Sequence, residues 1–366
     1  MHDLTSTAPP AFFHGHLRRW PSHEDHSLEF LRVLSAAEDG ASTVCECLTT
    51  AERIVPGDDE SWHREWKATA EASRKRGERA SAAGHKATAR MNWLRASNYF
   101  RTAEIFLDAG DARREFMLGK MRSCSQRYLE KLDLPGEIVK IPNIDGSTME
   151  AYLLSATEAP AKMQVVLCIG GWDDFKDEHL SKLPRHALDR GISLLLVELP
   201  KVSHRRRTRF ERFYVASSIE FCVDYLVKRH DVDEKRIAIY GLGLGASFAT
   251  QAAVLDRRFS AAVCDGGMLD LNRRAFALQR LVDPEGSGSV EPYLNKLAHH
   301  SVAKQIRCPV LVPIHDDVSR QSAGSIGNLA AHHVVAASGL KSDSRLSTEY
   351  IFDWIGSRFA EVGDEI

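Results

Sequence analysis

Apolar and polar positions follow two different patterns in the first third of the chain and in the rest. In residues 61–107, aromatic and alanine positions recur three and four residues apart, which predicts amphipathic helices. Gly84 divides this stretch into two helices, and a third is predicted over residues 112–132. The aromatic positions are predicted to form the core of a helical domain, and lining of a substrate cavity is the alternative. The positions concerned include Trp62, Trp66, Trp93, Tyr99 and Phe100.

The pattern changes after residue 133. Two alternating runs around Asp145-Gly146 predict a hairpin of antiparallel strands. Nearly continuous apolar runs then alternate with helical stretches, which is typical of a mostly parallel sheet covered on both faces. The predicted strands are "MQVVLCIGG", "ISLLLVELP", "RIAIYG", "SAAVCDGG", "CPVLVPIHDD" and "HHVVAAS". Helices are predicted near residues 178–190 and 212–229 and around "TEYIFDWIGSRF".

An antiparallel hairpin followed by a parallel sheet is the order of an α/β-hydrolase fold. The predicted fold class is therefore α/β, with an α/β-hydrolase fold preceded by a helical domain. We expect the helical domain to span residues 1–133 and to contribute to a lid and to dimerisation, and the hydrolase domain to span 134–366. A helical insertion is expected at about 270–303, where "DPEGSGSVEP" has the composition of a mobile lid loop.

Composition narrows the range of partners. The 366 residues are 43% hydrophobic and 27% charged, which is enough apolar material to bury a sizeable core. A net charge of −2 gives no general attraction to nucleic acid or membrane, and no run of 18 apolar residues or signal-peptide core is present. The seven cysteines form no Cys-x-x-Cys pair, and several lie in apolar runs, as reduced thiols do. We therefore expect a cytoplasmic protein that binds a small molecule, without a metal.

The stretch "DEKRIAIYGLGLGASFATQAAVL", residues 233–255, reads as a strand, a glycine-rich turn and a helix. One interpretation is a dinucleotide site, because Gly241, Gly243 and Ala246 satisfy Gly-x-Gly-x-x-Gly/Ala. Asp265 then lies at the end of the next strand, where a ribose-binding acid is expected. Such a fingerprint normally opens its domain, whereas at least four predicted strands precede it here.

The other interpretation is a nucleophile elbow, the sharp strand-to-helix turn with the pattern Gly-x-Ser-x-Gly. Gly241 and Gly245 supply both flanking glycines, but the middle position is Gly243. Gly171 and Trp172 follow an early strand, at the place where a hydrolase presents a backbone N–H to a developing oxyanion. The N–H of Leu244, the residue after the tip of the turn, is expected to be the second donor.

The motifs "GHKATARMNWLRASNYFRTAE", "IGGWDDFKDEH", "DVDEKRIAIYGLGLGA" and "IRCPVLVPIHDDVS" together resemble two-domain α/β-hydrolases with an N-terminal helical domain. That group includes 2,6-dihydropseudooxynicotine hydrolase, fungal polyketide-shortening hydrolases and the fermentation/respiration switch protein. The resemblance covers nearly the whole chain. It implies esterases or carbon–carbon bond hydrolases that act on ketone-bearing small molecules, and it implies a homodimer.

The resemblance also implies where the chain departs from the group. The nucleophilic serine aligns with Gly243, and the segment "ASGLKSDSRLSTEY", where the histidine of the group would lie, contains none. Asp317 best matches the acid. A covalent acyl-enzyme route of the usual kind is therefore not expected.

Other groups are candidates for proton transfer or substrate binding. His315, Asp317, Asp173, Asp265 and His204 are all expected at strand ends or loops that face the cleft, as acid–base groups require. In "LPKVSHRRRTRF", Arg205 and Arg206 are interpreted as part of a solvated basic loop. The alternative is a clamp, together with His204, for an anionic substrate such as a carboxylate, a phosphate or a carrier-bound acyl group.

These observations support several functional hypotheses. The leading one is an enzyme without a cofactor that uses acid–base groups and an oxyanion hole. It would act as a lyase, cyclase or isomerase, or cleave a carbon–carbon bond, on a ketone-bearing metabolite of secondary metabolism. The alternatives are a catalytically inactive pseudohydrolase that binds a ligand or partner, an NAD(P)-dependent oxidoreductase, and a hydrolase that activates water directly. Cys168 and Cys264 are expected to be buried strand thiols rather than nucleophiles.

Overall fold

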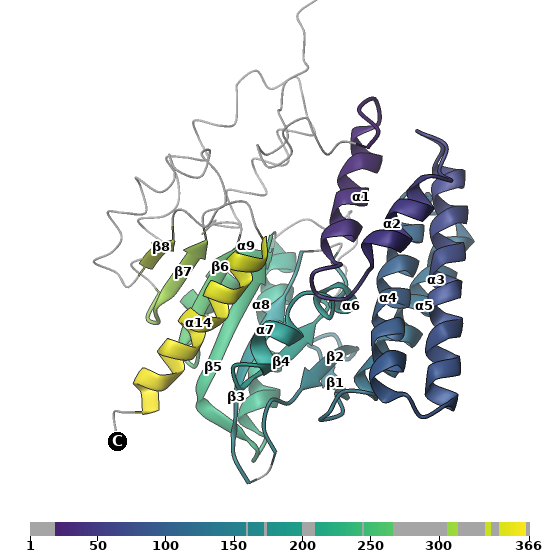
Figure 1. The fold of residues 1–366 in the computed structure, drawn as a ribbon. Coiled ribbons are helices and arrows are strands. Elements are labelled where there is room, and N and C mark those ends of the chain that lie inside the picture. The colour runs from purple at the N-terminus through teal and green to yellow at the C-terminus, as the bar shows by residue number, and fades with distance from the viewer. Residues whose placement is uncertain are drawn as a thin grey trace, which may run out of the picture. The chain divides into compact units, whose positions relative to one another are not determined.

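The structure is a computed structural model that describes residues 19–158, 160–171, 174–199, 209–243, 245–265, 306–313, 334–337 and 344–363. The chain divides into two units, drawn in Figure 1. One comprises the described residues up to Gly136 together with Asp177–Arg185, and the other comprises Glu137–Lys176 and the described residues from His186 onward. The insertion expected at about 270–303 lies outside the described residues.

The first unit is built from helices. They are α1 (Glu24–Ser35), α2 (Val44–Ala51), α3 (Asp59–Ala82), α4 (Lys86–Glu104) and α5 (Ala112–Leu129). The three helices predicted from the sequence, α3 to α5, are confirmed, and they lie side by side in Figure 1. Gly84 follows the end of α3 with φ of +75°, and the N–H of His85 donates to the carbonyl of Ala80 at 2.8 Å, which is a Schellman cap.

The sequence reading missed α1 and α2. Helix α2 has only eight residues, too few for a helical period to stand out, and its stability depends on its cap and its packing. The side chain of Thr43 accepts a hydrogen bond from the N–H of Glu46 at 3.2 Å and so satisfies one of the free donors of the first turn.

The predicted aromatic core of the helical unit is confirmed. Trp62 and Trp66 of α3 and Tyr99 and Phe100 of α4 are all fully buried. The indole N–H of Trp62 donates to the carbonyl of Thr102 at 2.8 Å, so its one polar group is paired. Burial of large aromatic surfaces is therefore the main contribution to the packing of α3 against α4.

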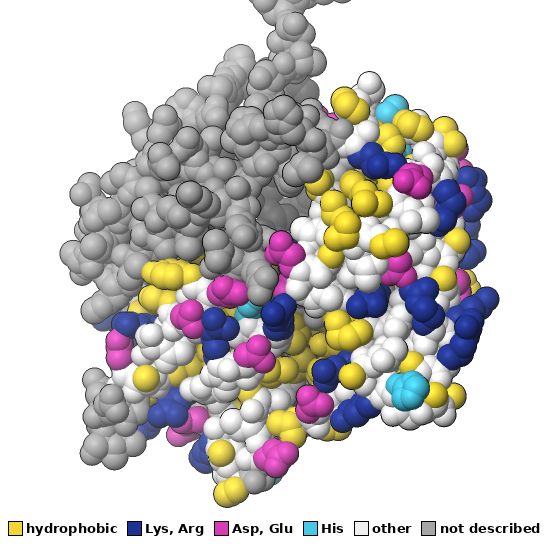
Figure 2. Space-filling model, in the orientation of Figure 1, with side chains coloured by type: hydrophobic (Ala, Val, Ile, Leu, Met, Phe, Trp, Pro, Cys, Tyr) yellow, Lys and Arg dark blue, Asp and Glu magenta, His cyan; other side chains and the backbone are white. Residues whose placement is uncertain are grey.

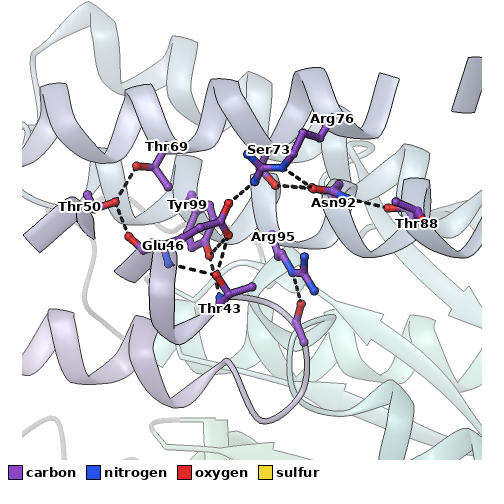
Figure 3. A network of polar contacts seen from close by, with 11 residues as sticks. Thr43, Glu46, Thr50, Thr69, Ser73, Arg76, Thr88, Asn92, Arg95 and Tyr99 are labelled. Atoms are coloured by element: carbon purple, nitrogen blue, oxygen red, sulfur yellow. Dashed lines mark hydrogen bonds and ion pairs between the residues drawn. The ribbon is translucent and has the colours of Figure 1, made fainter. Parts of the chain in front are cut away.

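A polar network runs through the same unit and joins α2, α3 and α4 (Figure 3). The carboxylate of Glu46 accepts hydrogen bonds from the hydroxyl of Tyr99 at 2.8 Å and that of Thr43 at 3.1 Å, and it pairs with Arg76. Arg76 also donates to Asn92 at 3.0 Å. Burial raises the pKa of Tyr99 far above its ordinary value, so its hydroxyl remains a donor to Glu46.

The second unit contains a sheet of eight described strands in the order β1-β2-β4-β3-β5-β6-β7-β8. Their bounds are β1 (Glu137–Pro142), β2 (Thr148–Leu154), β3 (Met163–Ile169), β4 (Ile192–Val197), β5 (Val232–Leu242), β6 (Ala261–Asp265), β7 (Val310–Pro313) and β8 (Val334–Ala337). Strand β2 pairs antiparallel with β1 and β4, and all other pairs are parallel. The predicted hairpin and the α/β-hydrolase fold class are confirmed.

Alternate residues of the strands face opposite helices, as the period of two requires. On one face, residues such as Leu167 and Ile239 belong to a hydrophobic cluster with residues of α8 (Arg209–Val227) and α9 (Gly245–Leu255). On the other face, the ring of Tyr240 lies 6.1 Å from that of Phe352 in α14 (Ser344–Gly363). Helices cover both faces of the sheet, which explains why the strand sequences are unbroken apolar runs.

The prediction of a single helix over residues 178–190 is wrong. The structure has two short helices there, α6 (Lys176–His179) and α7 (Pro184–Leu188), in place of one. Pro184 is the first residue of α7, a position where proline is favoured because it needs no N–H donor there. The same residue cannot continue a preceding helix, so the segment breaks before it.

The surface carries charges of both signs. Figure 2 shows Lys and Arg side chains interspersed with Asp and Glu side chains over the visible face of the described residues, in keeping with the net charge of −2. Ion pairs such as Lys86–Asp133 at 3.9 Å are largely exposed and contribute no more than about 1 kcal/mol each. Within the described ranges, no helix combines the length and the apolar composition needed to cross a membrane.

Two helix glycines give a direct test of the packing of the helical unit. At Gly119, on the exposed side of α5, a Cβ atom would meet nothing within 4 Å, so Gly119→Ala should raise the free energy of unfolding by up to about 1 kcal/mol. At Gly77, a Cβ would lie 3.0 Å from the buried ring of Trp93. We expect Gly77→Ala to lower the free energy of unfolding in urea titrations. A gain equal to that of Gly119→Ala would show that α3 and α4 are less closely packed than described.

Candidate functional site

The carboxyl ends of four neighbouring strands form one edge of the sheet. In register across β4, β3, β5 and β6 lie Val197, Ile169, Gly241 and Cys264. The chain leaves each strand within about one residue of this row, so the loops that follow are neighbours. In open parallel sheets this edge is where ligands bind.

The turn between β5 and α9 packs against the end of β3 by backbone contact. A Cβ atom on Gly245 would lie 2.4 Å from the carbonyl oxygen of Ile169, and one on Gly241 would lie 2.4 Å from the carbonyl oxygen of Gly245. Neither distance is possible for a real side chain. The two glycines that flank position 243 are therefore required by steric fit, as in a nucleophile elbow.

Position 243 differs from its two flanking glycines. Gly243 has φ of +52°, in the left-handed region, and a Cβ there would meet no described atom within 4 Å. Its N–H donates to the carbonyl of Asp265 at 2.6 Å, so this amide is not available to a pyrophosphate. Among the described residues, none therefore occupies the place where the elbow of a hydrolase carries its side chain.

Asp265, one of the predicted acid–base groups, lies beside this turn. It ends β6 and is half-buried, and its carboxylate accepts a hydrogen bond from the hydroxyl of Tyr240 at 3.0 Å. Burial, and then the nearby Asp265 carboxylate, raise the pKa of Tyr240 well above its ordinary value. The structure therefore brings Asp265 and Gly243 together, as predicted from strand order.

The N–H of Gly171, predicted to point at a developing oxyanion, is already engaged. It donates to the Oδ2 atom of Asp174 at 2.7 Å. The side chain of Asp174 also lies against Gly170, where an added Cβ would be 2.5 Å from the Cβ of Asp174. A carboxylate of the chain itself thus occupies the amide at which the substrate oxygen was expected.

A buried cation follows directly in the sequence. Lys176 is 3% exposed, and its Nζ lies 3.3 Å from Glu150 of β2 and 3.7 Å from Glu198, which follows β4. The ammonium group also lies over the ring of Tyr152, 4.8 Å from its centroid. These contacts fix the start of α6, and with it the end of the loop that begins at Gly170.

Sequence reasoning did not select Asp174, Lys176 or Glu198. Asp174 adjoins the selected Asp173, and the sequence does not say which of two adjacent carboxylates folds back onto the loop. Glu198 did carry a signal, since it is a charged residue that directly follows an apolar strand at the carboxyl edge. Lys176 belongs to the same motif, "GGWDDFKDEH", as the oxyanion loop.

Several predicted site residues lie outside the described residues. They are Trp172, Asp173, His204, Arg205, Arg206, Leu244, His315 and Asp317. Of the predicted set, the structure therefore places Gly171, Gly243 and Asp265, and all three lie at the carboxyl edge of adjacent strands.

The two strand cysteines are buried thiols, as predicted. Cys168 of β3 and Cys264 of β6 are fully buried, and burial raises the pKa of both, to about 12 for Cys264. The Sγ atom of Cys264 lies 3.3 Å from the hydroxyl of Thr250. A thiol that stays protonated at neutral pH is a poor nucleophile, so neither residue replaces the serine.

The helical unit contains a small cavity lined in part by Leu94, Arg101, Met121 and Asp177. Its volume of about 10 Å³ is room for roughly one water molecule, too little for an organic substrate. Within the part of the chain that the structure describes, no three His, Cys, Asp or Glu side chains are grouped to hold a metal ion.

Comparison with known proteins decides the family. Residues 42–280 match the family described as "Esterase FrsA-like", which covers the elbow and most of the helical unit. The chain belongs to this family. Membership in the FrsA-like family favours the elbow interpretation of "GLGLGA" over the dinucleotide interpretation, as does the engaged N–H of Gly243.

Curated relatives of this FrsA-like chain are fungal. It is 31% identical to the 20-hydroxy-prefusarin hydrolase FUS2 of Gibberella moniliformis over 67% of this chain and 61% of the relative. It is also 31% identical to the hydrolyase poxO of Penicillium oxalicum, over 68% of this chain and 61% of the relative. The chain thus spans about 61% of the length of these two relatives.

Solved structures agree on the fold. A crystal structure named as 2,6-dihydroxy-pseudo-oxynicotine hydrolase matches 89% of this chain and 96% of its own, with a TM-score of 0.70 at 20% identity. The AbyA5 structure matches 92% of this chain and 99% of its own, with a TM-score of 0.57 at 18% identity.

The glycines of the turn predict an order of stabilities. Gly241→Ala and Gly245→Ala each force a Cβ into backbone atoms, and we expect each to lower the free energy of unfolding by about 1–3 kcal/mol or more. Gly243→Ala has open space and should lose only about 1–2 kcal/mol, the cost of a positive φ. Thermal or urea unfolding measures the order. A Gly243→Ala variant less stable than both others would contradict the described turn.

The exposure of the cysteine side chains predicts how many of them react with a thiol reagent in the native protein. Of the seven cysteines only Cys45 is exposed, so the native protein should react rapidly with one equivalent of a disulfide reagent and the denatured protein with seven. Cys45→Ser should abolish the rapid reaction. Fast labelling of Cys168 or Cys264 in the native protein, located by peptide mass mapping, would reinstate a cysteine as a candidate nucleophile.

Proposed function

We propose that this chain is an atypical member of the FrsA-like family that catalyses proton transfer without a side-chain nucleophile. Its substrate would be a ketone-bearing small metabolite of secondary metabolism, and its reaction a lyase, cyclase or isomerase step or a carbon–carbon bond cleavage. Support for secondary metabolism comes from fungal relatives such as the 20-hydroxy-prefusarin hydrolase, which are named for small-molecule reactions.

The geometry of Gly243 is the observation that carries the proposal. Both flanking glycines keep their backbone contacts, while Gly243 has a positive φ and a Cβ there would meet no described atom within 4 Å. The turn therefore retains the form that aims a nucleophile, and no described side chain fills it. A substrate group can occupy this space and place a developing negative charge near backbone amides.

Proton transfer is the chemistry that such a site supports best. A preorganised backbone donor lowers the barrier to an enolate or alkoxide by about 3 kcal/mol. A carboxylate at the same edge supplies the base, and two described carboxylates lie there, those of Asp174 and Asp265. Outside the described ranges, Asp317, His315 and Asp173 are also proposed as acid–base groups. The N–H groups of Trp172 and Leu244 are proposed as hydrogen-bond donors to the developing negative charge.

The remaining parts of the proposal concern binding and assembly. His204, Arg205 and Arg206 are proposed to bind an anionic or carrier-bound substrate, because guanidinium groups pair with carboxylates and phosphates in bidentate fashion. The helical unit is proposed to contribute to a lid and a homodimer, with boundaries near residues 133 and 134, and the protein is proposed to act in the cytoplasm.

One observation favours a second candidate. The Gly171 N–H is occupied by Asp174, as it would be in a pseudohydrolase whose site no longer receives an oxyanion. Such a protein would bind a ligand or a partner without turnover. Turnover of a probe substrate separates the two candidates.

The proposal predicts that a serine alone does not restore ester hydrolysis. In a serine protease, loss of either the serine or the histidine costs on the order of 10⁶ in kcat, so a serine without its base contributes little. We expect Gly243→Ser to hydrolyse p-nitrophenyl acetate no faster than the matched Gly243→Ala variant, with no initial burst. Both variants add a Cβ at the same positive φ, so they should fold equally well.

The opposite result has a clear meaning. Rapid turnover by Gly243→Ser, with a burst of one equivalent of p-nitrophenol, would show that a functional base already lies beside position 243. The chain would then be a serine hydrolase that has lost one residue, and the proposal would be wrong.

A further inference from the structure

We propose that Asp174 is the general base of this site. The Gly171 N–H donates a hydrogen bond to the Asp174 carboxylate before proton transfer and to the substrate oxygen after it. This inference rests on the proposed function and names the group that takes the proton. It uses the described residues Gly170, Gly171 and Asp174–Lys176, which follow β3.

Asp174 lies close to the elbow. Its side chain lies against Gly170, and the carbonyl of Gly170 would be 2.8 Å from a Cβ on Gly245, the first residue of α9. Ile169, which precedes this loop, is in register with Gly241, two residues before the open position. The carboxylate and Gly243 therefore follow adjacent strands at the same edge of the sheet.

The Asp174 carboxylate is held in place by a hydrogen bond from Gly171 and by the burial of the two residues that follow it. Its Oδ2 atom accepts the Gly171 N–H at 2.7 Å, and the next two residues, Phe175 and Lys176, are 1% and 3% exposed. Lys176 is fixed in turn by Glu150 and Glu198. Asp174 itself is half-buried, and among the described residues no other hydrogen bond or ion pair to it is present. Proton abstraction requires a base that is held in a fixed position, as the Gly171 N–H holds this carboxylate.

The Gly171 amide can stabilise the negative charge of the Asp174 carboxylate and the negative charge that develops on the substrate oxygen. In the resting site the negative charge is on Asp174, and a hydrogen bond to a charged oxygen is about twice as strong as one to a neutral oxygen. The C–H proton of the substrate moves to the carboxylate, and the electron pair of that bond moves toward the substrate oxygen. Asp174 then becomes neutral and the oxygen negative, so the amide favours the oxygen. No oxidant or further reactant is needed.

Asp265 is less suited to this task. Its carboxylate accepts the hydroxyl of Tyr240 at 3.0 Å, and its carbonyl accepts the N–H of Gly243 at 2.6 Å. Both contacts tie Asp265 to the body of the sheet. We assign it a structural part in holding the turn, which makes it the natural comparison for Asp174.

Nitrobenzisoxazole is a suitable probe because its ring opens by a single proton abstraction. A base removes the C–H proton, the C–H electron pair forms the nitrile, and the N–O bond breaks to give a coloured phenolate. We expect the wild-type protein to accelerate this reaction over heat-unfolded protein. The Gly243→Leu variant, whose side chain fills the open space, should lose the acceleration, which locates the reaction at the elbow.

The matched variants decide whether Asp174 is the base. Asp174→Asn keeps an oxygen that can accept the Gly171 N–H but removes the base, so we expect the rate to fall by about 100-fold or more with an unchanged unfolding temperature. Asp231→Asn makes the same change just before β5, at the opposite edge of the sheet, and should leave the rate unchanged. Asp174→Ala should also be slow, and added formate should restore part of its rate, whereas formate should not help Asp174→Asn.

Each outcome has a separate consequence. If the wild-type protein shows no acceleration, the proposed function is contradicted. If the wild-type protein is active and Asp174→Asn retains its rate, the base lies elsewhere and the inference about Asp174 is overturned, while the proposed function stands. If Asp265→Asn loses the rate and Asp174→Asn does not, Asp265 is the base.

Discussion

Backbone contact between the β5–α9 turn and the end of β3 is the constraint on which the site depends. Gly245 lies so close to Ile169 and Gly170 that no side chain fits between them, and Gly241 is equally close to Gly245. These contacts fix where the chain leaves β5 and where α9 begins. They also place Gly170 beside the turn, so Asp174, which packs against Gly170, lies at the same edge of the sheet as Asp265.

That constraint explains how a family built around a nucleophile can keep its fold when position 243 is a glycine. The contacts that hold the turn belong to its flanking glycines and to the Gly243 N–H, which bonds to Asp265. None of them needs a side chain at position 243. In the proposed site, no described side chain stands at position 243, and Asp174 and Asp265 lie nearby. Such a site suits acid–base chemistry better than acyl transfer.

The sequence predicted the parts of the structure that depend on local pattern. The helical and strand periods placed α3 to α5 and the sheet, and the spacing of Gly241, Gly243 and Gly245 predicted a tight turn. It missed α2, which has eight residues and depends on its Thr43 cap, and it joined α6 to α7 across Pro184. At the site it selected Gly243 and Asp265 but not Asp174. Which carboxylate folds onto the Gly171 amide depends on the path of one turn, and the Lys176 pairs depend on the β2–β4 register.

The proposed lack of a side-chain nucleophile can be tested directly with a fluorophosphonate, which phosphonylates the activated serine of a serine hydrolase and loses fluoride. The intact mass of the wild-type protein is recorded after incubation with excess reagent, with a serine esterase treated in parallel. We expect the mass of this protein to stay unchanged while the esterase gains one adduct. A stoichiometric adduct on the wild-type protein would show that a serine elsewhere in the chain reaches the site, and catalysis without a nucleophile would be contradicted.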